Sequence, residues 1–254
     1  MKVEQIFFKN TLRNFSYIVT FYDGATFCID PYSAAEVQAA LGNRHLTAII
    51  NTHDHCDHHS GNEELIQRFN CPVWAHPHAK VPHKSRDLLH HEVIHAFEEW
   101  KMESVYTPGH TASHIGILIK KNKHPFAFFT GDCFFNAGVG NCRSGDATVL
   151  FHTVDNIFSS LPDDLIIYPG HEYLKRNLEF TLSVEKQNAD ALDFLQKIVG
   201  INMDETFFLN DMRTERKINT FLRLDEKSVV DGLHIPHNDK KAVFLKLREL
   251  RDHW

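Results

Sequence analysis

Residues 52–58, with the sequence THDHCDH, constrain the fold of this chain more than any other segment. They directly follow an apolar, β-rich run at residues 46–50, which is short enough to be a buried strand. Four of them, His53, His55, Asp57 and His58, carry the imidazole nitrogen or carboxylate oxygen that zinc and related divalent metals bind. One ion cannot easily take four ligands from so short a turn. Alternate residues can point to different places, so His53 and His55 could serve one ion, and Asp57 and His58 another; spacing alone leaves this partition open.

The alternative interpretation of this segment is a polar, histidine-rich surface loop. The chain contains 19 histidines, so a single histidine carries little information. A pattern H-x-H alone would not favour a metal site over a surface loop. The longer pattern H-x-H-x-D-H, placed directly after a buried strand, favours the metal site.

Three later segments repeat one arrangement, in which a predicted strand is followed by a glycine turn and then by a potential ligand. His110 follows the strand at 104–107, Asp132 follows the strand at 126–130, and His171 follows the strand at 165–168. A single aspartate at a strand end is more often a turn former or helix cap. Because active sites are usually built on loops at strand ends, the repeated arrangement predicts that these side chains converge.

The order of elements predicts an α/β fold followed by a small helical domain. Further strands are expected at 15–21 and 26–30, paired around an Asp23-Gly24 turn, and at 72–75 and 115–119; short helices are expected at 33–41 and 62–69. Residues 172–199 fit one long helix, with or without a break, and residues 200–221 are expected to be a loop. Residues 240–252 predict an amphipathic helix with its apolar face formed by Val243, Phe244, Leu247 and Leu250. The domain boundary is expected near Tyr173.

Size and charge exclude several classes of function. A chain of 254 residues suffices for one large domain, or for one domain with a small second one. The net charge of -6 argues against broad binding to nucleic acid or membrane surfaces, which requires a basic face. Residues 1–10 lack the apolar core of a secretion signal, so a cytoplasmic location is expected. The five cysteines form no CxxC pair, which argues against a thiolate zinc site and against a disulfide framework.

The seven potential ligands together resemble the metallo-β-lactamase superfamily. The resemblance implies a four-layer αβ/βα sandwich over residues 1–173, which would be the catalytic domain, and a helical substrate-binding domain over residues 174–254. It also implies two divalent metal ions, with zinc expected and iron or manganese also suited. By this resemblance the ligands would be His53, His55 and His110 for the first ion, Asp57, His58 and His171 for the second, and Asp132 as the bridge between them. Asp57 and Asp132 would be the catalytic carboxylates.

Within the superfamily, the C-terminal third is similar to the glyoxalase II (hydroxyacylglutathione hydrolase) family. Residues 170–173 (GHEY) and 177–180 (NLEF) resemble that family's entry into its helical domain, and residues 215–223 resemble its E-x-x-x-N-P-F-x-R segment, with Thr220 in place of proline. The resemblance implies that Arg248 and Arg251 hold the glycine carboxylate of glutathione and that Tyr173 donates to its peptide part. The alternatives are a solvated helix end for the two arginines and simple packing for Tyr173.

One segment departs from the family pattern. The family has G-C-G, then Lys or Arg, then an aromatic residue, whereas residues 138–143 read GVGNCR. The basic position is thus Asn141 and the aromatic position is Arg143. Either Arg143 reaches the substrate carboxylate from a new place, or the substrate is not linked to glutathione.

The reaction implied by the resemblance is hydrolysis of S-lactoylglutathione to lactate and glutathione, by attack of a hydroxide that bridges the metals. The expected partner is this small-molecule thioester, and the chain is expected to be a monomer or a weak homo-oligomer. Rival interpretations are another small-thioester hydrolase, a β-lactam hydrolase, and a metal-binding module without activity. A further rival is a persulfide dioxygenase with a single iron held by His53, His110 and Asp132.

Overall fold

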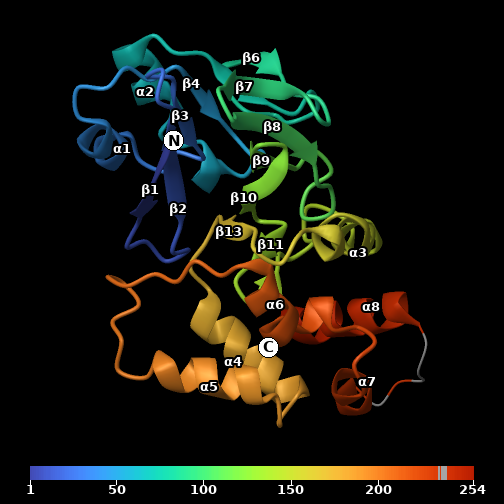
Figure 1. Cartoon of the computed structure of the whole chain (residues 1–254). Coiled ribbons are helices and arrows are strands. Elements are labelled where there is room, and N and C mark those ends of the chain that lie inside the picture. Colours follow the sequence, from blue (N-terminus) through green and yellow to red (C-terminus); the bar gives the residue numbers. More distant parts are fainter. Residues whose placement is uncertain (234, 236–238) are drawn as a thin grey trace.

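The computed structural model describes residues 1–233, 235 and 239–254 and contains two large β-sheets (Figure 1). The first sheet has the strand order β1-β2-β3-β4-β5-β6, and its strands are Lys2–Phe7, Phe15–Thr20, Thr26–Ile29, Ala48–Ile50, Val73–Ala75 and Lys84–Asp87. The second sheet has the order β13-β10-β9-β8-β7, and its strands are Ile166–Pro169, His124–Gly131, Ile115–Lys121, Trp100–Tyr106 and Val93–Phe97. A two-stranded ribbon, β11 (Phe134–Phe135) with β12 (Gly138–Val139), follows the end of β10.

Local sequence accounts for the first sheet and its helices. Strands β2 and β3 pair antiparallel around a turn in which Gly24 has a φ of 90°, a conformation that favours glycine. Strands β3, β4 and β5 then run parallel, which requires crossover connections. Helix α1 (Ala34–Leu41) and helix α2 (Asn62–Phe69) form these crossovers, as predicted.

Side-chain alternation in the strands gives the fold four layers. Tyr17 and Val19 of β2 pack between the sheets against Ile117 and Ile119 of β9, whereas Ile18 faces the opposite side. Ile18 shares a core with buried residues of α1 and α2, so these helices cover the outer face of the first sheet. On the second sheet, Leu118 and Phe128 face outward and pack against Leu150 and Val154 of helix α3 (Ala147–Asn156). The order helix, sheet, sheet, helix is the predicted αβ/βα sandwich.

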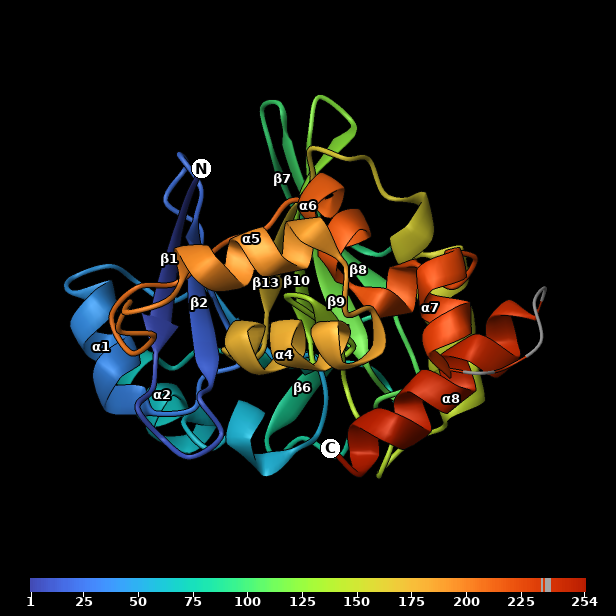
Figure 2. The same ribbon diagram turned by 90° about the horizontal axis from the view of Figure 1, so that it is seen from below.

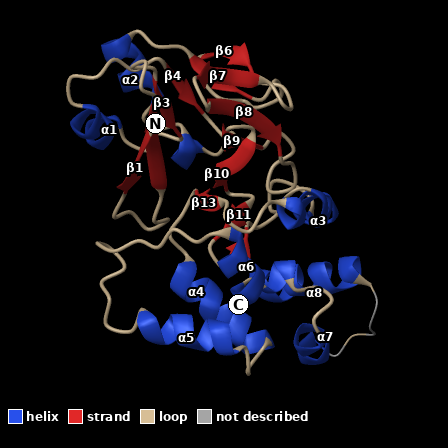
Figure 3. Cartoon of the chain, in the orientation of Figure 1, coloured by secondary structure: helices blue, strands red, loops and turns tan. Residues whose placement is uncertain are grey.

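The C-terminal part is helical and lies along one end of the sandwich (Figures 2 and 3). Its helices are α4 (Leu174–Val184), α5 (Ala189–Lys197), α6 (Met212–Ile218), α7 (Lys227–Leu233) and α8 (Lys240–Asp252). Phe180 of α4 and Phe244 of α8 join the same apolar core as α3, so the helices pack directly on the sandwich. In the described ranges, no helix is long and apolar enough to cross a membrane.

Two expectations for the helical part need correction, and a third is made specific. The helical segment at 172–199, expected with or without a break, has a break at residues 185–188, where the Asn188 side chain caps α5. The loop expected at 200–221 contains α6, which begins at the Asp211 cap and is stabilised by burial of Met212 and Ile218. On α8 the expected apolar residue Leu250 is 38% exposed, and the buried position next to Leu247 is Arg248.

Candidate metal centre

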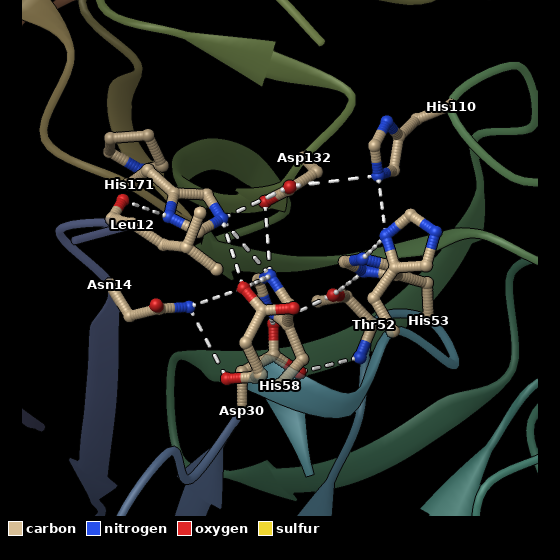
Figure 4. Close-up of polar contacts among 12 residues, drawn as sticks. Leu12, Asn14, Asp30, Thr52, His53, His58, His110, Asp132 and His171 are labelled. Atoms are coloured by element: carbon tan, nitrogen blue, oxygen red, sulfur yellow. Dashed lines mark hydrogen bonds and ion pairs between the residues drawn. The ribbon is translucent and has the colours of Figure 1, made fainter. Parts of the chain in front are cut away.

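Four strand ends meet at the edge of the two sheets and carry the potential ligands. Strand β4 leads into His53, β8 into His110, β10 into Asp132 and β13 into His171. Strands β10 and β13 are parallel neighbours whose last pair is Gly131 with Pro169, so Asp132 and His171 emerge side by side. Figure 4 shows His53, His58, His110, Asp132 and His171 turned toward one common centre.

Glycine is required where these strands end. Gly131 has a φ of 48°, and a Cβ at this position would lie 2.6 Å from Thr52 Oγ1. At Gly170 a Cβ would collide with Asp132 Oδ1. The turns therefore let the backbone approach the centre closely enough to bring Asp132 and His171 together.

The first group of ligand atoms comes from His53, His55, His110 and Asp132, all within 4.8 Å of one another. Nδ1 of His55 lies 3.0 Å from Nε2 of His53 and 3.0 Å from Nε2 of His110. His53 and His110 are buried and His55 is half-buried. Three imidazole nitrogens thus converge on one point that is nearly removed from water.

The second group consists of Asp57, His58 and His171, again within 4.8 Å. Nε2 of His58 lies 3.2 Å from Nε2 of His171, and Asp57 Oδ2 lies 3.6 Å from the same His171 nitrogen. Asp132 reaches both groups, because its oxygens are 3.1 Å from His171, 3.3 Å from His58 and 3.6 Å from His110. One carboxylate therefore connects two clusters of ligand atoms.

Hydrogen bonds on the outside of the centre orient the imidazoles. Nδ1 of His58 donates to Asp30 Oδ2 at 2.9 Å, Nδ1 of His110 donates to the Asn141 carbonyl at 2.6 Å, and Nδ1 of His171 donates to the Leu12 carbonyl at 2.7 Å. Carboxylate and carbonyl oxygens only accept, so each outer nitrogen carries the proton. Each inner Nε2 then presents a lone pair to the centre, as metal-binding histidines do.

Asp30 is a residue of this centre that the sequence analysis missed. It directly follows β3 and is buried. Besides His58, it accepts from the main-chain nitrogen of Thr52 at 2.8 Å and from the Thr52 hydroxyl at 2.7 Å. That hydroxyl has thereby given its proton away, so it accepts from Nδ1 of His53 at 2.9 Å and fixes that ring as well. The only signal in the sequence was an aspartate at a strand end.

The sequence analysis also missed His114 and Asn14, because their roles depend on contacts across the fold. His114 is buried, and its Nε2 accepts from the main-chain nitrogen of Asp132 at 3.2 Å while its Nδ1 donates to the Thr107 hydroxyl at 2.8 Å. Asn14 donates to Asp57 Oδ2 at 2.9 Å. Neither residue belongs to the two ligand groups, and each holds one of the two aspartates in place.

Without a metal ion, the centre holds neutral and charged side chains together. Burial opposes a charge on His58, but Asp132 and Asp30 outweigh it and raise the pKa of that ring well above its usual value. Burial lowers the pKa of His53 and of His110, so both rings are neutral at neutral pH. For Asp132, burial opposes ionisation, but His171 and His58 outweigh it and hold its pKa well below the usual value. The ionised carboxylate keeps a buried oxygen, Oδ1, for which the described residues provide no hydrogen bond.

These observations fit divalent metal ions. Inward lone pairs of neighbouring imidazoles repel one another, and a buried carboxylate oxygen without a hydrogen bond is costly, even with the His58 ring 3.3 Å away. A cation in each group satisfies both, and a donor set of imidazole and carboxylate suits zinc, iron or manganese. The residues present thus fit the expected cofactor.

A cavity of about 270 Å³, the arginine cavity, opens beside the centre. Its wall contains every substrate-binding residue expected from the sequence, namely Asn141, Arg143, Tyr173, Arg248 and Arg251. The Tyr173 ring stacks on His171 with an interplanar angle of 4°, and the Asn141 carbonyl accepts from His110. Two residues of the cavity wall thus contact potential ligands, Tyr173 through His171 and Asn141 through His110.

Arg176 and Trp254 also line this cavity and were missed. Arg176 lies three residues after Tyr173, at the spacing that places two side chains on one helix face. Its Nη2 donates to the Trp254 carbonyl at 3.3 Å. The sequence signal that could have identified Arg176 was its position close to Tyr173, as a basic residue in addition to Arg248 and Arg251.

The two arginines of α8 have different environments. Arg248 is 4% exposed, and its guanidinium donates to the Val139 and Gly140 carbonyls and to Asp252. Arg251 is half-buried, and among the described residues it donates only to Asn177 Oδ1, at 3.3 Å. Burial, together with Arg176 and Arg248, lowers the pKa of Arg251 to about 10, so it remains protonated at neutral pH. Arg248 is occupied within the protein, whereas Arg251 presents free charge.

Comparison with known proteins agrees with this geometry. Residues 11–171 match the family model of the metallo-beta-lactamase superfamily, and residues 172–254 match that of the hydroxyacylglutathione hydrolase C-terminus. Hydroxyacylglutathione hydrolases of Nitrosococcus oceani and of a Polaromonas species are 36% and 35% identical to the chain, and the matches cover 100% of each protein.

Among solved structures, the fold resembles that of ETHE1 from Myxococcus xanthus. The TM-score is 0.64 at 20% identity, and the match covers 93% of this chain and 92% of that one. At this identity the likeness concerns the fold alone. The curated relatives and the two family models decide the family: the chain belongs to the metallo-beta-lactamase superfamily and, within it, to the hydroxyacylglutathione hydrolases.

Proposed function

We propose that this protein hydrolyses thioesters of glutathione and that S-lactoylglutathione, cleaved to lactate and glutathione, is its substrate. The observation that carries the proposal is the Asp132 carboxylate, which reaches both ligand groups next to the arginine cavity, whose wall contacts His171 and His110. The curated relatives from Nitrosococcus oceani and Polaromonas, which cover the whole chain, carry the corresponding name.

The proposed cofactor is a pair of zinc ions. His53, His55 and His110 would hold one ion, Asp57, His58 and His171 the other, and Asp132 would lie between them. When bound, such ions lower the pKa of a water molecule and polarise a carbonyl group. Asp30, Thr52 and the main-chain carbonyls of Leu12 and Asn141 keep the imidazoles aimed inward.

Asp57 and Asp132 are the proposed catalytic carboxylates. Asn14 fixes Asp57 by donating to its Oδ2, and His114 fixes Asp132 through its main-chain nitrogen. Asp132 retains a buried oxygen without a hydrogen bond from the described residues. These carboxylates can accept the protons of a water molecule and thereby aim its oxygen at the thioester carbon.

The arginine cavity suits the glutathione arm of the substrate. Arg248 forms an ion pair with the Asp252 carboxylate. In the described part of the chain, no carboxylate pairs with Arg143, Arg176 or Arg251. Glutathione carries two carboxylates, and guanidinium groups bind carboxylates with two parallel hydrogen bonds. Arg143 and Arg176 thus supply the charge that Asn141 lacks, and Arg248 holds the loop at 139–140 in place. The Tyr173 hydroxyl would donate to the peptide part.

The proposed division into a catalytic and a substrate-binding domain follows the two segments matched by the family models. We propose that residues 1–173 form the catalytic domain and residues 174–254 the substrate-binding domain. Both line the arginine cavity, since Asn141 and Arg143 come from the first segment and Arg176 and Arg251 from the second. With this substrate the protein would act in methylglyoxal detoxification in the cytoplasm, as a monomer or a weak homo-oligomer.

The proposal is tested by loading the protein with zinc and measuring hydrolysis of S-lactoylglutathione. Release of glutathione at a rate proportional to bound metal supports it. A metal-loaded protein without turnover contradicts it and leaves the fold assignment intact. Oxygen uptake with glutathione persulfide, measured on an iron-loaded sample, would instead indicate a persulfide dioxygenase.

A further inference from the structure

A second cavity, of about 390 Å³, adjoins the metal centre at a different ligand. His55 lines it, and Nε2 of His55 is 3.0 Å from the Ser144 hydroxyl, which also lines it. None of its lining residues lines the arginine cavity, which meets the centre through Tyr173 beside His171. The centre therefore has two separate cavities at its border.

A thioester has two arms, and its carbonyl group must lie at the centre where water attacks. If the thiol arm lies in the arginine cavity, as the proposed function requires, the acyl arm must leave the centre by another route. The cavity at His55, which we name the acyl cavity, provides that route. It is lined by Asp54, His55, His78, Lys80, Thr111, Ala112, Ser113 and Ser144.

Seven of the eight residues that line the acyl cavity carry polar side chains, but the surface that they expose to it is mostly apolar. Apolar surface suits the methylene groups of an acyl chain. A polar group at the end of such a chain therefore needs a specific partner on the wall.

The acyl cavity also carries charge. In the described structure, no carboxylate pairs with the Lys80 ammonium, and His78 lies beside it on the same wall. Asp54 Oδ2 accepts from the main-chain nitrogen of Lys80 at 3.1 Å, which ties Lys80 to the segment that carries His55. On this wall, Asp54 can accept hydrogen bonds from hydroxyl groups, and the Lys80 ammonium can bind the negatively charged end of an acyl group.

We propose that this cavity is the acyl subsite of the enzyme and that it favours acyl groups that end in a carboxylate facing Lys80. This inference rests on the proposed function and names the acyl class it accepts. The hydrolysis itself is unchanged. Water forms the new bond to the acyl carbon, the carbon–sulfur bond breaks, and the sulfur leaves with a proton as the thiol.

The test compares three glutathione thioesters on the zinc-loaded enzyme: lactoyl, succinyl, and butyryl as the uncharged counterpart of succinyl. Wild-type kcat/KM should be higher for succinyl than for butyryl. Lys80→Met should lower the succinyl value by about fivefold, the size of one partly exposed ion pair, and leave butyryl and lactoyl nearly unchanged. Lys241→Met is the matched control, because Lys241 is an exposed lysine of α8 outside both cavities.

A Lys80→Met enzyme that keeps the wild-type ratio of succinyl to butyryl overturns the inference while lactoyl turnover upholds the proposed function. A wild-type enzyme that cleaves none of these thioesters overturns both.

Discussion

Oδ2 of Asp132 lies 3.1 Å from Nε2 of His171, and the same carboxylate extends to the ligand group on the other side of the centre. The two residues are neighbours because β10 and β13 are parallel and end together at Gly131 and Pro169. The proposed metal binding and hydrolysis both depend on this carboxylate between two clusters of imidazoles.

Replacing this carboxylate should abolish both properties. Asp132→Ala removes the carboxylate that reaches both ligand groups and leaves Asp57 as the remaining carboxylate near the inner nitrogens of His58 and His171. We expect loss of bound metal and of thioester hydrolysis together, measured by elemental analysis and by release of glutathione. Near-normal activity in this variant would contradict a bridging position.

Asp30 should affect metal affinity without being a ligand. Asp30→Asn weakens the acceptor for the His58 Nδ1 proton and for the Thr52 hydroxyl, so two rings lose their fixed orientation. Loss of such an outer partner typically costs 10- to 100-fold in metal affinity. Competition with a chelator measures this affinity. If the variant binds metal as tightly as the wild type, these outer hydrogen bonds do not control the centre.

The arginine cavity predicts that Arg176 contributes to substrate binding. Arg176→Ala should raise KM for S-lactoylglutathione several-fold and leave kcat nearly unchanged, because it removes an interaction made equally in ground state and transition state. Lys175→Ala, next to it on α4 but outside this cavity, is the control. An equal effect of both substitutions would indicate general surface charge in place of a specific contact.

Arg248→Ala should instead destabilise the protein. The buried guanidinium holds the carbonyls of Val139 and Gly140 and the carboxylate of Asp252, and its removal leaves these acceptors unpaired. The expected loss of unfolding free energy is about 2 kcal/mol or more, measured by urea denaturation. A variant with wild-type stability and a raised KM would show that Arg248 binds substrate directly.

Glu215 predicts a pH dependence of stability. This carboxyl group is fully buried beneath the β11–β12 ribbon, where it accepts from the Ala137 main chain, Asn210 and Asn219. Burial raises its pKa from 4.5 to about 7. The folded state therefore binds the proton more tightly than the unfolded state. Below about pH 4.5 both states are protonated and the carboxyl costs nothing, whereas ionisation on raising the pH to 7 destabilises the fold.

This contribution can be isolated by comparison with Glu215→Gln. The difference in unfolding free energy between wild type and variant should change by roughly 3 kcal/mol between pH 4.5 and 7.5, with the wild type losing stability as the pH rises. Urea denaturation at several pH values measures it. A difference that does not vary with pH would mean that Glu215 is ionised throughout, with a normal pKa.

The sequence predicted those parts of the fold that depend on local pattern. Asn62–Phe69 and Lys240–Asp252 were predicted with their observed bounds, because apolar spacing and capping residues mark both helices. Helix α6 was missed because its seven residues carry only two buried apolar side chains, and packing against the sandwich stabilises it. Strand β6, with the sequence KSRD, has no apolar alternation and is held by pairing at the sheet edge.

The site divides in the same way. His53, His110, Asp132 and His171 could be proposed as ligands because each follows a recognisable strand, and the structure brings them within one small volume. Asp30, His114 and Arg176 could not, because their importance lies in contacts across the fold. Leu250 was wrongly placed in the apolar face, since helical spacing alone does not reveal that Arg248 is covered by the Val139 loop.

The most direct test of this account is a titration of metal-free protein with zinc, following bound metal and S-lactoylglutathione hydrolysis in the same samples. We expect zinc binding to saturate at two equivalents per chain, with full activity only when both ions are bound. In Asp132→Ala we expect neither this saturation nor the activity. Full activity at one equivalent, with the second ion bound weakly or not at all, would contradict the central claim that two ligand groups work through one shared carboxylate.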